Sequence, residues 1–395
     1  MKPLSNKSNE IQASITLAIS AKAKMLKSQG ISVIGFGAGE PDFDTPDYIK
    51  QAGKEAIDNG FTRYTASSGI PELKKAICEK FQNDNNLTYA ENQIIVSCGA
   101  KHSLFNTLCA ICNEGDEVII IAPYWVTYLE QIKFAGAKPV ILESEPDFSL
   151  DIEKLSKAIN SKTKALIINS PSNPTGAIYD ETVIAKIAEL AIKNDIYVIS
   201  DEIYEEIIYD KKHVSIASLN EDIKKRTIVI NGVSKSFAMT GWRIGYAAAE
   251  KTIIDNMNKL QSHSTSNAAS IAQKAAVAAL TGGKDAIKHM LTAFKERRDY
   301  IVGELQLIEG IKCNKPEGAF YAFPDVSTFY GKKMNDLQVN DSLAFANALL
   351  NEEKVAVVPG SAFGNDKCVR FSYALGLDDI KEGIKRFKSF IQKLN

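Results

Sequence analysis

Between residues 93 and 231, short runs of β-branched and other apolar residues alternate with longer segments of helical periodicity. The runs are "QIIVSC", "EVIIIAP", "KPVIL", "KALIINS", "IYVISD" and "RTIVIN". Because each run is continuously apolar rather than alternating, each strand is expected to be buried on both faces. Such strands, separated by helices, predict an α/β fold with a mostly parallel central sheet and helices on both faces.

The rest of the pattern predicts a second, smaller α+β domain. Its strands are expected in "GAFYAFPDV", "VAVVPG" and "CVRFSYA", and the N-terminal helix in "SITLAISAKAKMLKSQG" is expected to end at Gly30 and to pack with it. At 395 residues the chain is long enough for about two domains. The expected boundaries are 1–45 for an N-terminal arm and part of the small domain, 46–290 for the large domain, and 291–395 for the small C-terminal domain. Helices are expected at 101–112, 124–135, 151–160, 180–194, 251–279, 284–306, 340–352 and 377–393.

Composition narrows the functional class. With 45% hydrophobic and 24% charged residues and a formal net charge of -1, the chain has neither the basic excess of a nucleic-acid-binding protein nor that of a protein bound to anionic membranes. No segment approaches a membrane span, and the N-terminal residues lack the apolar core of a secretory signal. We therefore expect a cytoplasmic protein with neither a nucleic-acid nor a membrane partner.

The six cysteines favour reduced thiols over a disulfide framework. Cys109 and Cys112 form a CxxC pair, but it lies in a helical segment with no second pair and no histidine placed to complete a zinc site. A core helix face is the preferred interpretation, and no metal is expected.

Polar residues follow four of the predicted strands, at the edge where open α/β sheets bind ligands. Gly99-Ala100-Lys101 follows the first run, and Asn173 lies in the "SPSNPTG" that follows "ALIIN". Asp201 and Tyr204 follow "YVIS", and Lys235 follows "TIVIN". Each has an ordinary alternative: "NPTG" as a turn, Asp201 as a helix cap, Lys235 as a surface lysine, and Arg243 as a salt-bridge partner.

Together these groups suit one phosphorylated cofactor. The glycine turn before Lys101 offers backbone N–H groups and a helix N-terminus to a phosphate, and Arg243 adds a two-pronged donor. A lysine forms a Schiff base with an aldehyde, and an acid facing a pyridine nitrogen keeps the ring an electron sink. Pyridoxal 5'-phosphate (PLP) carries the phosphate, the aldehyde and the pyridine nitrogen that these groups would bind.

The segment "GVSKSFAMTGWRIG", residues 232–245, resembles the pyridoxal-lysine signature of class I PLP-dependent aminotransferases. The resemblance extends over essentially the whole chain, and it is closest to the bacterial-type aspartate and prephenate aminotransferase subgroup. It implies a fold type I PLP-transferase acting as a homodimer with shared active sites. The other segments that carry it are "GAGEPDFDTP", "RYTASSGIPELKKAI", "APYWVTY", "NSPSNPTGAIY", "SDEIYEEIIY" and "CVRFSYA".

The resemblance also implies roles in holding the cofactor. Lys235 would bind PLP covalently and later carry a proton between the substrate and the cofactor, and Asp201 would pair with the pyridinium nitrogen. Asn173 and Tyr204 would bond the phenolic oxygen, with Trp125 stacked on one ring face and Ile203 on the other. The phosphate would be held by Ser234, Arg243, the backbone at Ala100 and Lys101, and Tyr64 of the partner subunit. Many relatives carry a serine three residues before the lysine, where this chain has Gly232.

For the substrate, the resemblance implies that Arg370 binds the α-carboxylate, with the backbone of Gly39, Trp125 and Asn173 nearby. A guanidinium offers the planar two-point match that orients the substrate. The three glycines around Gly37 superficially imitate a dinucleotide loop, but they lack the G-x-G-x-x-G spacing, and Pro41 follows where a helix should open.

Lys101 would reach a distal carboxylate, which favours aspartate and 2-oxoglutarate as substrates in a ping-pong transamination. A role for Lys101 only near the phosphate is the alternative. Prephenate, aromatic or neutral amino-acid transamination stays open, as does, at greater distance, a PLP-dependent carbon–sulfur lyase. A PLP-sensing regulator would be expected to carry an added DNA-binding region.

Overall fold

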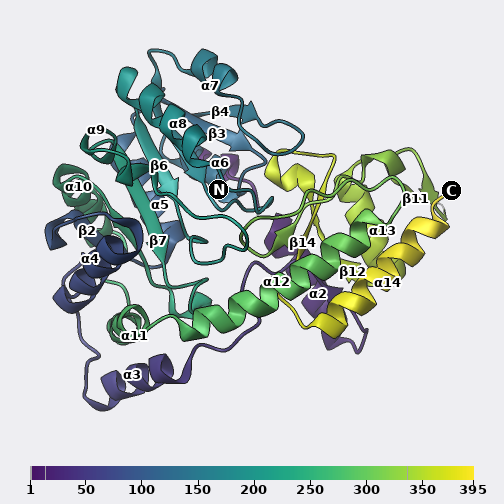
Figure 1. Cartoon of the computed structure of the whole chain (residues 1–395), viewed down its shortest axis with the longest axis horizontal. Helices are drawn as coiled ribbons and strands as arrows, with labels where there is room; N and C mark the ends of the chain where they lie inside the picture. Colours follow the sequence, from purple (N-terminus) through teal and green to yellow (C-terminus); the bar gives the residue numbers. More distant parts are fainter. Residues whose placement is uncertain (1, 14, 336) are drawn as a thin grey trace.

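The computed structural model describes residues 2–13, 15–335 and 337–395, and a seven-stranded sheet forms the centre of its larger part (Figure 1). The strand order is β2-β8-β7-β6-β5-β3-β4, and β8 alone runs antiparallel to its neighbours. The predicted mostly parallel sheet is therefore confirmed. The strands are β2 (Ile94–Ser97), β3 (Glu117–Ala122), β4 (Lys138–Glu143), β5 (Thr163–Asn169), β6 (Tyr197–Asp201), β7 (Thr227–Gly232) and β8 (Gly245–Ala248).

The antiparallel strand β8 lies inside the glycine-punctuated segment 232–249, where the sequence analysis had placed no strand. All four of its residues are buried, and Gly245 pairs with Gly232 at the end of β7. A β-carbon at Gly245 would lie 2.0 Å from the backbone nitrogen of Ala100, so only glycine allows this close approach. Because β8 begins beside the carboxyl end of β7, Arg243, two residues before β8, lies near that strand end.

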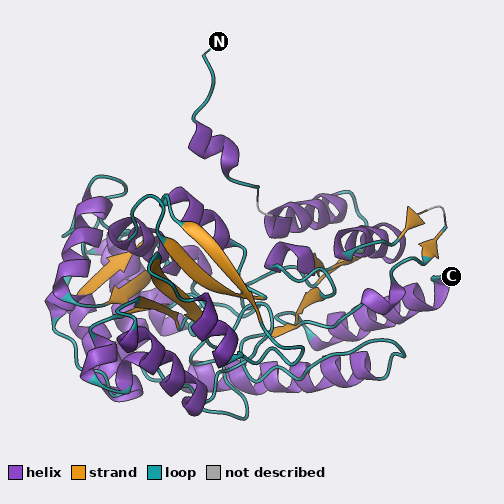
Figure 2. Cartoon of the chain, turned by 90° about the horizontal axis from the view of Figure 1, so that it is seen from above, coloured by secondary structure: helices purple, strands orange, loops and turns teal. Residues whose placement is uncertain are grey.

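Helices cover both faces of this sheet (Figure 2). Ile119, Leu166 and Val198 face one apolar cluster, while Ile120, Ile167 and Ile199 face another, which is why the runs are apolar without alternation. The helices are α3 (Asp47–Asp58), α4 (Pro71–Asn85), α5 (Ala100–Ile111), α6 (Thr127–Phe134), α7 (Ile152–Ala158), α8 (Glu181–Lys193), α9 (Glu221–Lys224), α10 (Lys251–Ser262) and α11 (Ser270–Thr281).

The helix expected over 251–279 is instead two helices, α10 and α11. The backbone carbonyl of Gln261 accepts from the amides of Ser264, Thr265 and Ser266, and Ser266 has a positive φ of 58°. In the intervening "HSTSN", the four residues after the histidine are Ser, Thr or Asn, whose side chains compete with the helix for backbone hydrogen bonds. The apolar periodicity continues on either side of this segment, and for that reason a single helix was predicted from the sequence.

The smaller part contains segments from both ends of the chain. The long helix α12 (Asp285–Gln306) runs into it beside α14 (Leu377–Lys393) (Figure 1). Its apolar core includes Phe36, Phe294, Phe345 and Phe371. The predicted boundary at residue 290 falls inside α12, and the domain boundaries stay a prediction. The remaining elements are α1 (Asn6–Glu10), α2 (Ile15–Ser28), α13 (Ser342–Glu353), β1 (Ile34–Gly35), β9 (Tyr321–Ala322), β10 (Lys333–Met334), β11 (Leu337–Gln338), β12 (Val355–Ala356), β13 (Val358–Pro359) and β14 (Val369–Ser372).

The structure also describes Gly30 and the Cys109–Cys112 pair, for which the sequence made predictions. Gly30 follows α2 with a φ of 82°, as the predicted helix end requires. Cys109 and Cys112 are free half-buried thiols at the end of α5, and burial raises both pKa values. Among the described residues, no helix is both long and apolar enough to cross a membrane.

Candidate active site

A cavity of about 440 Å³ lies at the carboxyl ends of the central strands, bounded on its other side by the smaller part of the chain. Twelve residues assigned to the site from sequence line it. They are Gly39, Ala100, Lys101, Trp125, Asn173, Asp201, Ile203, Tyr204, Ser234, Lys235, Arg243 and Arg370. Tyr64 is the exception: it lies outside the cavity with 91% of its surface exposed.

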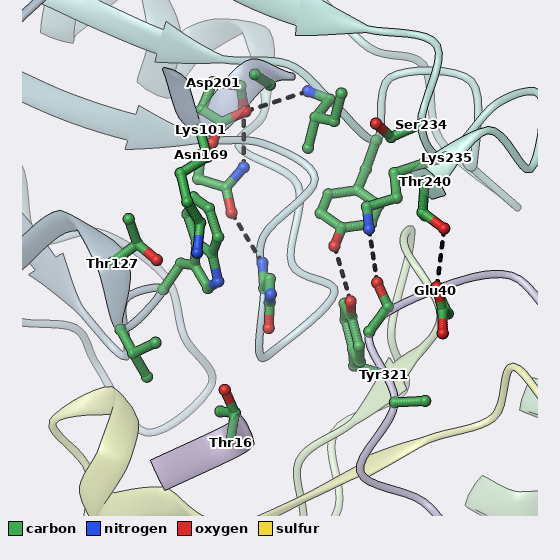
Figure 3. Close-up of a pocket in the computed structure, with 18 of the residues that line it drawn as sticks. Thr16, Glu40, Lys101, Thr127, Asn169, Asp201, Ser234, Lys235, Thr240 and Tyr321 are labelled. Atoms are coloured by element: carbon green, nitrogen blue, oxygen red, sulfur yellow. Dashed lines mark hydrogen bonds between the residues drawn. The ribbon is translucent and has the colours of Figure 1, made fainter. Parts of the chain in front are cut away.

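Asp201 ends β6 and points into the cavity (Figure 3). Its side chain is buried, and it accepts a hydrogen bond of 2.6 Å from the hydroxyl of Tyr128 and one of 3.3 Å from the amide of Ile203. Burial raises the pKa of Asp201 to about 6, although these two donors and Lys235 act in the opposite direction. This carboxylate is therefore buried without a contacting cation among the described residues, and a cationic partner would lower its pKa.

Two residues beside Asp201 were missed from sequence. Tyr128 lies on α6, one helical turn after Trp125, and its ring packs edge-on against that indole at 5.5 Å. Asn169 ends β5, donates to the backbone carbonyl of Asp201 at 2.9 Å and accepts from the amide of Asn173 at 2.9 Å. Both lie in quoted motifs, at a strand end or a helical turn from a predicted residue, which is the signal that could have identified them.

Lys235 follows β7, and its ammonium nitrogen donates to the backbone carbonyl of Gly39 at 2.6 Å (Figure 3). Burial lowers the pKa of Lys235 to about 8; Glu40 opposes this shift, while Arg370 and Arg243 add to it. A primary amine with this pKa is partly unprotonated near neutral pH, as attack on an aldehyde requires.

The hydroxyl groups of Tyr204 and Tyr321 share a hydrogen bond of 2.7 Å beside Lys235. Tyr204 comes from the turn after β6 and Tyr321 from β9, so this contact joins the two parts of the chain across the cavity (Figure 3). Tyr321 was not assigned to the site from sequence, because "GAFYAF" reads only as a strand.

Arg370 lies on β14 and is 3% exposed. Its guanidinium donates to the side-chain oxygen of Asn173 at 2.8 Å and to the carbonyl of Gly37 at 2.9 Å, while its Nε has no hydrogen-bond partner within the described part of the chain. It stacks 4.5 Å from the centre of the Tyr321 ring, and burial lowers its pKa. A buried arginine held by neutral oxygens suits an anionic ligand.

Ala100 and Lys101 at the start of α5 line the cavity together with Arg243, next to the Gly99 turn. Gly99 has a φ of 87°, and a β-carbon there would lie 2.4 Å from an Arg243 nitrogen. Arg243 has a φ of 57° and donates to the carbonyl of Thr240 at 2.8 Å. Backbone N–H groups at a helix N-terminus beside a guanidinium form a binding site for phosphate.

Gly232 ends β7, three residues before Lys235. A β-carbon there would lie 2.9 Å from the carbonyl of Ile244 and 3.0 Å from the backbone of Gly245. The close pairing of β7 with β8 therefore accounts for glycine at this position.

Lys101 lies on the first turn of α5, with its ammonium nitrogen 4.9 Å from the centre of the Trp125 ring. Burial lowers its pKa, and Arg243 adds to the effect. Thr16 and Lys24 of α2 line the cavity as well, and neither was assigned from sequence.

The donor set fits PLP. The α5 turn offers a phosphate cradle that a β-carbon at Gly99 would fill, Lys235 offers a buried amine, and Asp201 offers a carboxylate without a contacting cation. The unpartnered Nε of Arg370 adds a second anion-binding position.

Comparison with known proteins agrees with this chemistry. The family model described as aminotransferase class I and II matches residues 31–387. The aspartate aminotransferase of Bacillus subtilis (strain 168) is 50% identical over 393 residues, which cover 99% of both chains. A probable aspartate/prephenate aminotransferase of Aquifex aeolicus (strain VF5) is 46% identical over 398 residues and the full length of both.

Solved structures agree in fold as well. The aspartate aminotransferase from Rhizobium meliloti superimposes with a TM-score of 0.96 at 42% identity over 100% of both chains. That of Thermus thermophilus, solved with maleate, has a TM-score of 0.93 at 40% identity, covering 99% of this chain and all of the other. Family membership implies a PLP-dependent enzyme, and the fold type I architecture expected from sequence is confirmed. The chain belongs to the class I and II aminotransferase family.

Proposed function

We propose that this enzyme is an aspartate aminotransferase, which converts L-aspartate and 2-oxoglutarate to oxaloacetate and L-glutamate. The main observation in support is that one cavity holds a buried amine at Lys235, a buried carboxylate at Asp201 and a buried guanidinium at Arg370. Relatives named aspartate aminotransferase, about half identical over the full chain, support the choice of substrate.

PLP would supply an aldehyde for the amino group and a ring that accepts electrons from the substrate Cα–H bond. Lys235 would hold its aldehyde, Asp201 its pyridinium nitrogen, and Asn173 and Tyr204 its phenolic oxygen. Trp125 and Ile203 would lie against the ring faces. The phosphate would be bound by the amides at Ala100 and Lys101, Ser234 and Arg243.

Lys235 would also move the proton. As a free amine beside the bound substrate, it would take the proton from the substrate Cα and pass it to the aldehyde-derived carbon of the cofactor, and it would carry a proton in the reverse direction in the second half of the cycle. The lowered pKa, about 8, favours this exchange near neutral pH.

Arg370 would bind the α-carboxylate, replacing its present contacts with neutral oxygens by a charge-assisted pair. Gly39, Trp125 and Asn173 would line the same position. Lys101 would bind the distal carboxylate of aspartate. The binding of maleate, a dicarboxylate, by the Thermus thermophilus relative supports a site with two anion-binding positions.

The enzyme would act as a homodimer in which Tyr64 of each subunit reaches the phosphate of the other. The 91% exposure of this tyrosine and its position outside its own cavity support the assignment.

Half-reactions with single amino acids test the substrate assignment. Aspartate and glutamate should convert lysine-bound PLP to pyridoxamine phosphate faster than alanine or tyrosine does. Lys101→Ala should slow aspartate about 10- to 100-fold and leave alanine nearly unchanged, since one charge-assisted contact is lost. Equal losses for both amino acids would contradict the assignment of Lys101.

Prephenate is the second candidate, because the Aquifex aeolicus relative is named for both substrates. Adding arogenate to the panel separates the two, and an arogenate rate above that of aspartate would favour prephenate transamination. Release of pyruvate and ammonia without an acceptor would indicate a lyase instead.

A further inference from the structure

Two buried glutamines lie beneath the exposed loop that carries Tyr64. In this loop, residues 62–70, Thr62, Arg63 and Tyr64 are exposed, whereas Gly69 and Ile70 are buried. Gly69 has a φ of 107°, and a β-carbon there would lie 2.6 Å from the Val96 side chain. The loop thus packs closely against β2 at its C-terminal end and is exposed to solvent at its N-terminal end.

Gln273 of α11 is fully buried and bonds the loop at its middle and at its C-terminal end. Its oxygen accepts from the amide of Ile70 at 2.8 Å, and its nitrogen donates to the hydroxyl of Thr65 at 3.1 Å and the carbonyl of Ala268 at 2.8 Å. Every hydrogen bond described for this side chain goes to the Tyr64 loop or to the α10–α11 connection.

Gln261 of α10 is also fully buried, and its bonds go further. Its nitrogen donates to the carbonyls of Ser67 at 2.7 Å and Val96 at 2.8 Å. Its oxygen accepts from Ser97 at 2.7 Å and Asn106 at 3.0 Å. Ser97 ends β2 just before the Gly99 turn, so this one side chain joins the Tyr64 loop to the phosphate cradle of its own cavity.

Such fully bonded, buried amides fix backbone position strongly, because losing one partner leaves a buried polar group unpaired. A loop held in this way presents an exposed aromatic side chain with little ordering cost on association.

We propose that Gln261 and Gln273 are positioning residues that hold the Tyr64 loop for the phosphate site of the second subunit. Gln273 acts only on the partner's site, whereas Gln261 acts on both sites because it also holds the Gly99 turn. This inference rests on the proposed homodimeric function, in which Tyr64 crosses the interface.

Mixed dimers test the difference between the two glutamines. One subunit carries Lys235→Ala, so that PLP can be linked to lysine only in the other, intact site. Gln273→Met is then placed either in the intact subunit or in the Lys235→Ala subunit, which supplies Tyr64 to the intact site. PLP retained on Lys235 after dilution is trapped with borohydride and counted by mass.

Gln273→Met should weaken PLP retention at the intact site about tenfold when it lies in the opposite subunit, and should leave it unchanged in the same subunit. Gln261→Met should weaken retention in both arrangements. Amide hydrogen exchange of residues 62–70 should accelerate in each variant. Thr65→Val, which removes only the hydroxyl bonded by Gln273, should reproduce a smaller effect from the opposite subunit without endangering the fold.

Gln306→Met is the control for the substitution itself, because this exposed glutamine of α12 also donates to a backbone carbonyl, that of Cys313 at 2.8 Å, and has no described hydrogen bond to the loop. It should change neither PLP retention nor exchange at 62–70. Equal effects of Gln273→Met from either subunit, or unchanged exchange at 62–70, would overturn the inference alone. A wild-type protein that is monomeric or takes up no PLP would overturn the proposed function together with it.

Discussion

Asp201 and Glu205 lie four residues apart, both buried, and their surroundings act on them in opposite directions. Burial raises the pKa of Asp201 to about 6, because its contacts are a phenol and an amide. Burial acts on Glu205 too, but Lys80 and His213 outweigh it and hold its pKa at about 2. Glu205 contacts the Lys80 ammonium directly and accepts from Asn85 at 2.7 Å and Asn231 at 2.5 Å.

This difference distinguishes charged residues that stabilise the fold from charged residues that are available to bind a ligand. Glu205 and Lys80 satisfy each other inside the protein, so the pair contributes to holding α4 against the turn after β6. Among the residues that the structure describes, Asp201, Lys235 and Arg370 have no contacting partner of opposite charge, which costs stability in the free protein and leaves their charges for a ligand. Substitutions should therefore affect folding at the Lys80–Glu205 pair and binding or catalysis in the cavity.

The largest expected effect is on stability at the Lys80–Glu205 pair. Lys80→Met leaves Glu205 buried without its cation and should lower the free energy of unfolding by about 3–5 kcal/mol. Denaturant unfolding measures this change. Lys75→Met, at an exposed pair on the same helix, should cost no more than about 0.5 kcal/mol.

Arg370→Lys should produce the next largest effect, on substrate rather than on folding. A lysine cannot replace the two-point contact, and the loss of about 2–4 kcal/mol should lower kcat/KM for aspartate roughly 30- to 1000-fold. Steady-state kinetics with aspartate measure it, beside the surface control Arg386→Lys. A larger loss of stability than of kcat/KM would contradict the distinction between the two regions.

Asp201→Asn should change how stability depends on pH. Because the folded pKa of about 6 lies above the ordinary 3.8, ionised Asp201 destabilises the fold, and this penalty develops as pH rises from about 4 to 6. The variant should therefore gain on the order of 3 kcal/mol relative to wild type between pH 4 and 7. Unfolding of cofactor-free protein at these pH values measures it, and a pH-independent difference would contradict the prediction.

Glu205 should show the opposite sign. Its folded pKa lies below the ordinary value, so its stabilisation is present above about pH 4.5 and is lost as pH falls towards 2.

The smallest effect is expected at Thr240, whose hydroxyl donates to Glu40 at 2.8 Å and links the Lys235 and Gly39 segments. Thr240→Val removes one partly exposed hydrogen bond, about 0.5–1.5 kcal/mol, and should lower kcat/KM roughly 2- to 13-fold. An unchanged kcat/KM would show that the two segments hold their positions without it.

Sequence predicted the fold and most of the cavity because strand ends converge in a parallel sheet. Asp201 and Lys235 could be placed together from the apolar runs that precede them. Tyr321 could not, because the contact with Tyr204 depends on how the smaller part packs. The break between α10 and α11 was missed since it depends on local capping at Gln261. The roles of the site residues, the homodimer and the cytoplasmic location stay predictions.

Lys235 is the residue on which the proposed chemistry depends most directly. Borohydride reduction of the PLP-loaded enzyme followed by peptide mapping should place one pyridoxyl phosphate group per chain on Lys235, and Lys235→Ala should abolish both the adduct and transamination. An adduct on another lysine, or transamination retained by Lys235→Ala, would contradict it.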